Sequence, residues 1–266
     1  MNAEENYIEI NRKLWNEKTE HHVKSDFYDM EGFLVGNTSL KTPELELLGD
    51  VKGKNIVHLQ CHFGQDTLSL ARMGAKMTGV DLSDASIDYA NELTEKMGLE
   101  AKFIASDIYD VPEVLEEQFD VVFNTYGVLG WHPDAERWAK VVAGLLKQGG
   151  EMIIVDFHPM VWMFDNEFTK FQYSYFNTGP IVETLEGTYA ERAADIQMKE
   201  VGWNHTLSDI IQSLIDAGLT IEVFKEYDWA AYDCFKNTVK IAEGKWQIKG
   251  MEGIIPMMYA IKAVKG

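Results

Sequence analysis

Between residues 55 and 156, short apolar runs alternate with segments whose apolar residues recur every three or four positions. The short runs predict strands, and the longer spacing predicts helices between them. The expected strands are Asn55–Gln60, Met77–Asp81, Ala101–Ala105, Phe119–Asn124 and Met152–Asp156. Strands and helices in this rhythm predict an α/β fold with right-handed crossovers and a doubly wound, mostly parallel sheet.

Individual boundaries follow from capping residues. Ser83 is expected to cap a helix that runs to Met97, and a further helix is expected over Asp134–Leu146. The strand at Phe119–Asn124 begins with the apolar run FDVVF, which is typical of a strand covered on both faces.

The rhythm changes after residue 156. Aromatic residues alternate with polar ones across 157–200, which predicts an inserted β-hairpin or small antiparallel sheet. A capped helix is expected from Thr206 to just before Gly218, followed by a strand at Thr220–Tyr227. A loop is then expected as far as Gly253, and a last strand at Pro256–Val264.

The N-terminal residues have a different character. Glu4–Lys18 is predicted to be helical, and Thr42-Pro43-Glu44 has the pattern that begins a second, short helix. We therefore expect an N-terminal helical cap over residues 1–50 and a main unit over 51–266, with the aromatic-rich insertion at 157–200. Together they would form one structural domain.

Composition narrows the choice of partners. Of 266 residues, 46% are hydrophobic and 12% aromatic, which excludes a disordered chain. The formal net charge of −19 would repel phosphate backbones and anionic lipids, so we expect neither nucleic acid nor membrane as a partner. The two cysteines form no CxxC pair, and the acidic start MNAEENYIEI is unlike a signal peptide. A cytoplasmic protein is therefore expected.

The first candidate for chemistry is the strand–turn–helix–strand segment Asn55–Ser83, whose second strand ends in Asp81. In nucleotide-binding α/β units the first turn meets the ligand, and an acid at the tip of the second strand binds ribose hydroxyls. The sequence therefore predicts that the protein binds a small molecule containing adenosine.

Several motifs occur in a fixed order: the turn ending in Gly64, GVDLS, the SDI of Ser106–Ile108, FDVVFNTYGVL and LLKQGGEMIIVDF. In this order the chain resembles the class I S-adenosylmethionine-dependent methyltransferases, most strongly over residues 55–156. The resemblance implies a Rossmann-like methyltransferase fold with seven strands, the last one antiparallel. It also implies S-adenosyl-L-methionine as cofactor and direct in-line transfer of a methyl group to a small-molecule acceptor.

The resemblance also implies roles for four residues at strand ends. Asp81 would hold the two ribose hydroxyls, and Leu82 would lie beside the adenine. Asp107 would accept the adenine amino group, with Ile108 against the face of the ring. As alternatives, Asp81 could be a helix-capping acid and Asp107 part of a surface loop.

The first turn departs from the family's pattern of acid-x-Gly-x-Gly-x-Gly. This chain has the variant HLQCHFG, in which only Gly64 keeps its glycine. Gln60 and His62 must do without the conformational freedom of glycine. The Gln60 carbonyl could still accept from the cofactor's ammonium, and either side chain could reach its carboxylate; a remnant that binds nothing is the alternative. His58 is expected to be a buried structural histidine.

The acceptor is expected beyond the carboxyl ends of the fourth and fifth strands, where polar and aromatic residues cluster in the sequence. His158 is the first candidate for a general base and Tyr126 the second, and Asn124 is expected at the cofactor. Alternatively, His158 only bonds the backbone before Pro159. The histidines show no metal-binding spacing, so no metal is expected.

Two further groups have two interpretations each. Trp15 and Tyr28 are expected to line the cofactor site, as an N-terminal segment closing over it, unless they only pack. The aromatic segment Trp162–Phe176 could roof an acceptor pocket, or it could form the surface of a homodimer.

The sequence leaves three alternatives to a small-molecule methyltransferase. A NAD-dependent Rossmann oxidoreductase shares the opening unit, but the chain lacks the GxGxxG pattern. A cofactor-binding protein without turnover would keep the same site. A nucleic-acid methyltransferase is disfavoured by the charge and by NTYG at residues 124–127, where an NPPY-like motif would stand.

Overall fold

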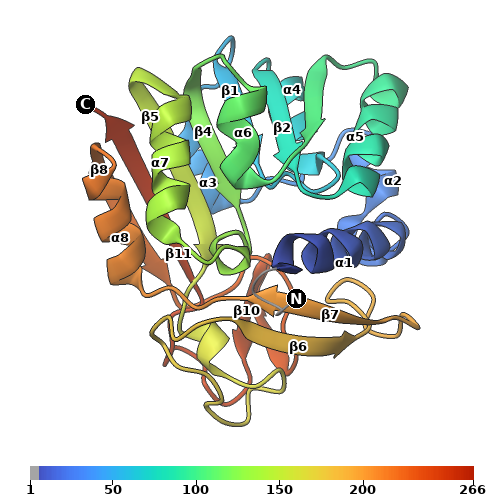
Figure 1. Ribbon diagram of the computed structural model, residues 1–266. Coiled ribbons are helices and arrows are strands. Elements are labelled where there is room, and N and C mark those ends of the chain that lie inside the picture. The colour runs from blue at the N-terminus through green and yellow to red at the C-terminus, as the bar shows by residue number, and fades with distance from the viewer. Residues whose placement is uncertain (1–5) are drawn as a thin grey trace.

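The computed structural model describes residues 6–266, and a seven-stranded sheet forms its centre (Figure 1). The strand order is β3-β2-β1-β4-β5-β11-β8. The strands are β1 (Asn55–Leu59), β2 (Lys76–Asp81), β3 (Ala101–Ala105), β4 (Phe119–Thr125), β5 (Leu146–Phe157), β8 (Leu219–Tyr227) and β11 (Met258–Lys265). Strand β11 runs antiparallel to both its neighbours, and the pairings among β1–β5 are parallel. The predicted doubly wound sheet with an antiparallel last strand is confirmed.

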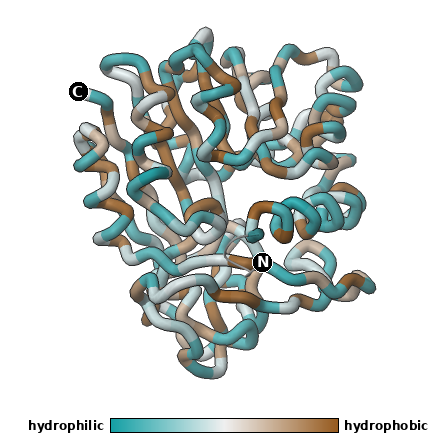
Figure 2. Tube along the Cα trace, in the orientation of Figure 1, coloured by the Kyte–Doolittle hydropathy of each residue, from teal (hydrophilic) through white to brown (hydrophobic). Residues whose placement is uncertain are grey.

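Helices cover both faces of this sheet. They are α3 (Thr42–Leu48), α4 (Gln65–Arg72), α5 (Asp84–Met97), α6 (Val111–Val114), α7 (Ala135–Leu145) and α8 (Leu207–Asp216). Val122 belongs to the core shared with α7 and α8, whereas its neighbour Val121 packs with residues of α3 and α4. Figure 2 shows the hydrophobic residues gathered along the strands. The apolar run in β4 is therefore explained by burial on both sides.

Helix starts follow their local signals. The side chains of Ser83, Asp134 and Thr206 each accept a hydrogen bond from a backbone N–H in the first turn of α5, α7 and α8, respectively. These caps lie where the sequence predicts them, because capping depends on residues only three positions apart.

The N-terminal elements lie at the carboxyl ends of the strands. They are α1 (Tyr7–His22), the 3-10 turn η2 (Asp26–Tyr28) and α2 (Met30–Leu34). The predicted first helix continues one turn beyond Lys18, to His22, and its expected start at Glu4 lies outside the described residues. In Figure 1, α1 crosses below the lower ends of the strands, with the hairpin of β6 and β7 on its other side.

Two hairpins lie outside the main sheet. Strands β6 (Ile181–Glu186) and β7 (Gln197–Gly202) pair antiparallel, so the predicted inserted hairpin exists. Within the stretch 157–200 that predicts it, the aromatic segment Trp162–Phe176 is mostly irregular, with a 3-10 turn, η5 (Val161–Met163). The loop expected up to Gly253 is wrong in part, because β9 (Thr238–Ala242) and β10 (Lys245–Ile248) form a second hairpin there. Its strand β9 is largely exposed, which leaves a weak apolar signal.

Gly79 of β2 has no room for a side chain. A Cβ there would lie 2.6 Å from the ring of Phe103 and 2.9 Å from Cys61 Sγ, whereas a Cβ at Gly144 in α7 would meet open space. We predict that Gly79→Ala destabilises the protein by about 1–3 kcal/mol through overpacking. Gly144→Ala should stabilise it by about 0.5–1 kcal/mol, because alanine favours the helix. Urea denaturation of both variants measures this, and equal midpoints would contradict the packing described.

Candidate functional site

The turn that follows β1 has an unusual backbone. Gln60, His62 and Gly64 all have positive φ, at 58°, 50° and 83°. Gln60 and His62 thus adopt the left-handed conformation without the conformational freedom of glycine. Such a conformation costs an L-residue on the order of 1–2 kcal/mol. Long-range contacts must compensate for this strain.

Those contacts are specific hydrogen bonds. The backbone N–H of His62 donates to Asp81 Oδ2 at 2.7 Å, and the Gln60 side chain donates through Nε2 to the carbonyl of Val128 at 3.0 Å. The His62 ring lies between two partners, with Nδ1 3.0 Å from Ser86 Oγ and Nε2 2.9 Å from His22 Nδ1. The turn is thereby tied to β2, to the loop after β4 and to α1.

Gly64 ends the turn and precedes α4. Gly64 has a positive φ, and a Cβ at this position would lie 2.7 Å from the ring of Phe103. Both the backbone conformation and the packing therefore require glycine here, which explains why this one glycine of the turn is kept.

Asp81 ends β2 and faces the same turn. Its Oδ2 accepts from His62 N and its Oδ1 accepts from Ser83 N at 2.9 Å, so each oxygen keeps capacity for a second hydrogen bond. Burial raises the pKa of Asp81 to about 6, and the N–H donors of Ser83 and His62 oppose that rise. Ser83, not Asp81, caps α5. A pair of carboxylate oxygens in this arrangement suits a vicinal diol.

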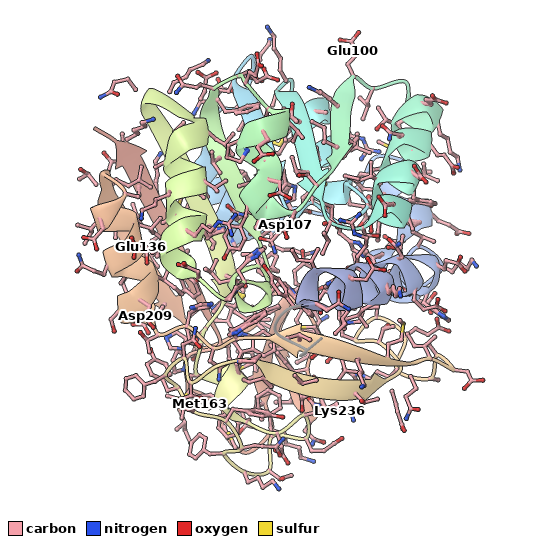
Figure 3. The ribbon with its side chains drawn as sticks, viewed as in Figure 1. Glu100, Asp107, Glu136, Met163, Asp209 and Lys236 are labelled. Atoms are coloured by element: carbon pink, nitrogen blue, oxygen red, sulfur yellow. The ribbon has the colours of Figure 1, made fainter. Side chains whose placement is uncertain are left out.

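Asp107 follows β3, the neighbour of β2. Its Oδ1 accepts from the backbone N–H of Tyr109 at 2.7 Å, within the 3-10 turn η3 (Ile108–Asp110). Burial raises the pKa of Asp107. The N–H of Ser106 donates to the carbonyl of Asp81 at 2.9 Å, which holds the two strand ends together. Figure 3 shows Asp107 at the end of the sheet that faces α1.

A cavity of about 1220 Å³ opens at these strand ends. It is lined by ten of the twelve predicted site residues: Trp15, Tyr28, Gln60, His62, Gly64, Asp81, Leu82, Asp107, Ile108 and Tyr126. Single small-molecule pockets usually measure about 300–1,000 Å³. This cavity therefore has the volume for a cofactor and a second molecule.

The N-terminal segment forms part of the cavity wall. The Trp15 ring lies 5.3 Å from the ring of His62 and 5.3 Å from that of Trp131. Tyr28 shares a 2.5 Å hydrogen bond with the hydroxyl of Tyr189, and its carbonyl accepts from Gln65 Nε2. Both Trp15 and Tyr28 thus face the turn after β1 from outside the sheet.

A buried ion pair, which the sequence analysis does not predict, lies in the same wall. Lys18 of α1 is 4% exposed, and its Nζ lies 3.7 Å from Glu200 Oε2 on β7. The ammonium also lies over the rings of Trp15 and Trp131, at 4.8 and 5.6 Å from the ring centroids. Burial lowers the pKa of Lys18 and raises that of Glu200. No local signal joins residues so far apart in the sequence.

Two predicted residues lie outside the cavity lining. His158 is 4% exposed; its Nδ1 accepts from Met160 N, and its Nε2 lies 3.0 Å from Glu226 Oε1. Both ring nitrogens of His158 are thus engaged, one by the backbone of Met160 and one by Glu226, and neither faces the cavity lining. Asn124 is fully buried beneath the cavity lining, with Nδ2 donating to the carbonyl of Leu59 at 3.3 Å.

Tyr126 does line the cavity, at the end of β4. Its φ is 47°, and its hydroxyl donates to Oε2 of the fully buried Glu44 at 2.9 Å. The pKa of Tyr126 is raised well above 10 by burial and by Glu44, so a phenolate does not form there at neutral pH. Tyr126 is therefore better suited to shaping the wall than to accepting a proton.

Asp156 fixes the loop that follows Tyr126. Its carboxylate accepts from the backbone N–H groups of Gly127, Val128 and Leu129. Burial raises the pKa of Asp156 to about 6 despite these donors. This loop supplies the Val128 carbonyl that holds Gln60, so Asp156 positions the turn after β1 indirectly.

The aromatic segment after β5 also contributes to the site. Trp162, Phe164, Phe168 and Tyr173 line the cavity, whereas Phe171 and Phe176 are 64% and 68% exposed. The segment thus has an inner side that could contact an acceptor and an outer side that could contact a partner. Both interpretations of Trp162–Phe176 remain open.

The described residues were also compared with the requirements of a metal site and of a membrane-spanning helix. Across residues 6–266, no cluster of three or more His, Cys, Asp or Glu side chains has a geometry that could hold a metal ion. Within the same range, no helix has the length and apolar character needed to cross a membrane.

The sequence has recognisable relatives. Residues 56–150 match a family model described as a methyltransferase domain. A ubiquinone biosynthesis O-methyltransferase of Coxiella burnetii is 32% identical over 122 residues, which make up 45% of this chain and 49% of the relative. The chain thus spans about half the length of that relative. A Bacillus subtilis protein named as the uncharacterized methyltransferase YbaJ is 25% identical over 240 residues, 85% of this chain and 91% of the other.

Solved structures resemble the whole chain. An S-adenosylmethionine-dependent methyltransferase from Clostridium acetobutylicum matches with a TM-score of 0.59 and 14% identity, over 95% of this chain and 99% of that one. Another from Mesorhizobium loti matches with a TM-score of 0.55 and 19% identity, over 87% and 99%. The protein has the Rossmann-like methyltransferase fold. At these identities the likeness establishes the fold, and function has to be argued from the site.

Because Glu44 is buried beside Tyr126, the stability of the folded protein should depend on pH through this carboxyl group. Burial raises the pKa of Glu44 from 4.5 to about 7. The folded state therefore binds this proton more tightly than the unfolded state, and the contribution of Glu44 to stability falls as pH rises from about 4.5 to 7. We predict that Glu44→Gln removes this loss. The difference in free energy of unfolding between the variant and the parent protein should therefore shift in favour of the variant by up to about 3 kcal/mol from pH 5 to pH 8.5.

Urea denaturation at the two pH values measures that difference. Glu46→Gln is the control, because Glu46 is exposed on the same helix and pairs with Lys225 at the surface. The free energy of unfolding of Glu46→Gln should follow that of the parent protein at both pH values. An equal pH response of the two variants would show that Glu44 is not a destabilising buried carboxylate.

Proposed function

We propose that this protein is an S-adenosyl-L-methionine-dependent methyltransferase that acts on a small molecule. The observation that carries the proposal is the pair of carboxylates, Asp81 and Asp107, at adjacent strand ends in one cavity. They lie within the segment that matches the methyltransferase domain model. The sheet order reverses between β1 and β4, and open α/β sheets bind their ligands at such a switch point.

The residues present fit the adenosine part of this cofactor. Asp81 would accept from the two ribose hydroxyls, since each of its oxygens carries only one backbone N–H. The carboxylate of Asp107 would accept from the adenine amino group. Leu82 and the nearly buried Ile108 would cover the faces of the base, which needs apolar contacts together with an edge acceptor. Gln60, His62 and Gly64 would supply the backbone of the turn that lies next to the cofactor.

When bound, S-adenosylmethionine supplies an electrophilic methyl group that an acceptor takes by in-line displacement. The task of the chain is then to orient the acceptor and to exclude water. The elements outside the sheet fit this task, because α1, the 3-10 turn after β4 (Leu129–Trp131) and the aromatic segment after β5 complete the cavity with Trp15, Trp131 and Trp162, respectively. Tyr126 would form the wall next to the acceptor.

A small-molecule acceptor fits the charge and the enclosed site. The net charge of −19 disfavours nucleic acid, and residues of several separate elements line the cavity. The proposal includes a homodimer. Its contact surface would be the outer side of the aromatic segment, where Phe171 and Phe176 are exposed.

Calorimetric titration with S-adenosylhomocysteine and with NAD tests the proposal. Heat of binding with S-adenosylhomocysteine and none with NAD is expected, because the site has paired carboxylates and no GxGxxG turn for a pyrophosphate. Binding of NAD alone would favour an oxidoreductase. If S-adenosylhomocysteine binds but S-adenosylmethionine is never consumed with a broad panel of small phenols, amines, thiols and acids, the protein is a cofactor-binding protein without turnover.

A further inference from the structure

We propose that Asp66 binds the α-ammonium group of the cofactor's methionine moiety, in place of an acid that β1 does not supply. The inference rests on the proposed function and names a residue for a part of the cofactor that Asp81 and Asp107 do not reach. It assigns a binding role to a carboxylate that the sequence analysis did not single out.

The strand order gives the direction in which the cofactor extends. Asp107 follows β3 and Asp81 follows β2, and the next strands along the sheet are β1 and β4. With the base at β3 and the ribose at β2, the methionine moiety has to lie across the ends of β1 and β4. Near neutral pH that moiety carries an ammonium group, which in a largely enclosed site needs an anion or several acceptors.

Asp66 is the carboxylate at this place. It stands in the first turn of α4, directly after the turn of β1, and it is partly exposed and lines the cavity. Its Oδ2 accepts from the hydroxyl of Thr125, the last residue of β4, at 3.0 Å. No hydrogen bond from residues 6–266 reaches its Oδ1. One oxygen is therefore anchored, and the other is left for a ligand.

The end of β1 itself provides no negative charge. His58 stands where the family pattern has its acid, and it is 2% exposed. Its Nδ1 lies 2.9 Å from Thr67 Oγ1 and its Nε2 lies 3.2 Å from Thr125 Oγ1. Burial lowers the pKa of His58 to about 4, so the ring is neutral at pH 7. His58 positions Thr125, and through it Asp66, but cannot balance an ammonium.

Among residues 6–266, Asp66 forms no ion pair with a Lys or Arg nitrogen within 4 Å. Lys41, which also lines the cavity, lies over the ring of Tyr232 at 4.9 Å. Tyr28 and Tyr232 line the same cavity as Asp66; burial raises the pKa of both phenols, and the negative charge of Asp66 adds to that rise. A carboxylate among aromatic rings and without a counter-ion suits a cation.

Two ligands separate this inference from a general effect on the site. S-adenosylhomocysteine carries the ammonium, whereas 5′-methylthioadenosine has the same adenosine and thioether without the amino acid. We predict that Asp66→Asn weakens binding of S-adenosylhomocysteine about 10- to 100-fold, the range of a charge-assisted hydrogen bond, and leaves 5′-methylthioadenosine unchanged. Calorimetry on the 266-residue chain gives both affinities.

Asp88→Asn is the matched control, because it removes one negative charge from an exposed position on α5. It should change neither affinity. A loss for S-adenosylhomocysteine alone in Asp66→Asn supports the inference. Equal losses for both ligands, or no loss for either, would overturn it and leave the proposed function standing. If the parent protein binds neither ligand, the proposed function itself is wrong, and this assignment falls with it.

Discussion

The hydrogen bond from the backbone of His62 to the carboxylate of Asp81 is the contact on which the site depends. It joins the turn after β1 to the end of β2 and helps to hold a non-glycine residue at positive φ. The same carboxylate accepts from Ser83 at the start of α5. One acid thus fixes a strained turn and presents its remaining lone pairs to the cavity. Burial that raises its pKa to about 6 is part of the cost of this arrangement.

The strain in the turn is distributed over contacts from elements far apart in the sequence. The His22 ring of α1 touches the His62 ring, and the Val128 carbonyl holds the Gln60 side chain. A glycine-rich turn would need none of these partners. In this chain, α1 and the loop after β4 supply contacts that hold the turn. The N-terminal helix is therefore part of the site's framework as well as a wall of the cavity.

Much of the fold could be predicted from the sequence, because parallel strands and capped helices leave local signals: Ser83, Asp134 and Thr206 cap where expected. The expected place of Asp81 followed from its position at a strand end, and that of Asp107 followed from the resemblance to the methyltransferases. His158 was expected near the acceptor, but a position after a strand does not reveal which way a side chain points; its Nε2 lies 3.0 Å from Glu226 Oε1, and it does not line the cavity. The positive φ at His62 and the pair of Lys18 with Glu200 depend on distant partners, which one sequence does not reveal.

The central claim is that Asp81 holds a ribose at this edge of the sheet. A crystal structure of the protein grown with S-adenosylhomocysteine tests it most directly. The account predicts both ribose hydroxyls within about 2.5–3.0 Å of the Asp81 carboxylate oxygens, with the adenine beside Asp107 and Ile108. Density for the ligand at another place, or a ribose turned away from Asp81 toward solvent, would contradict it.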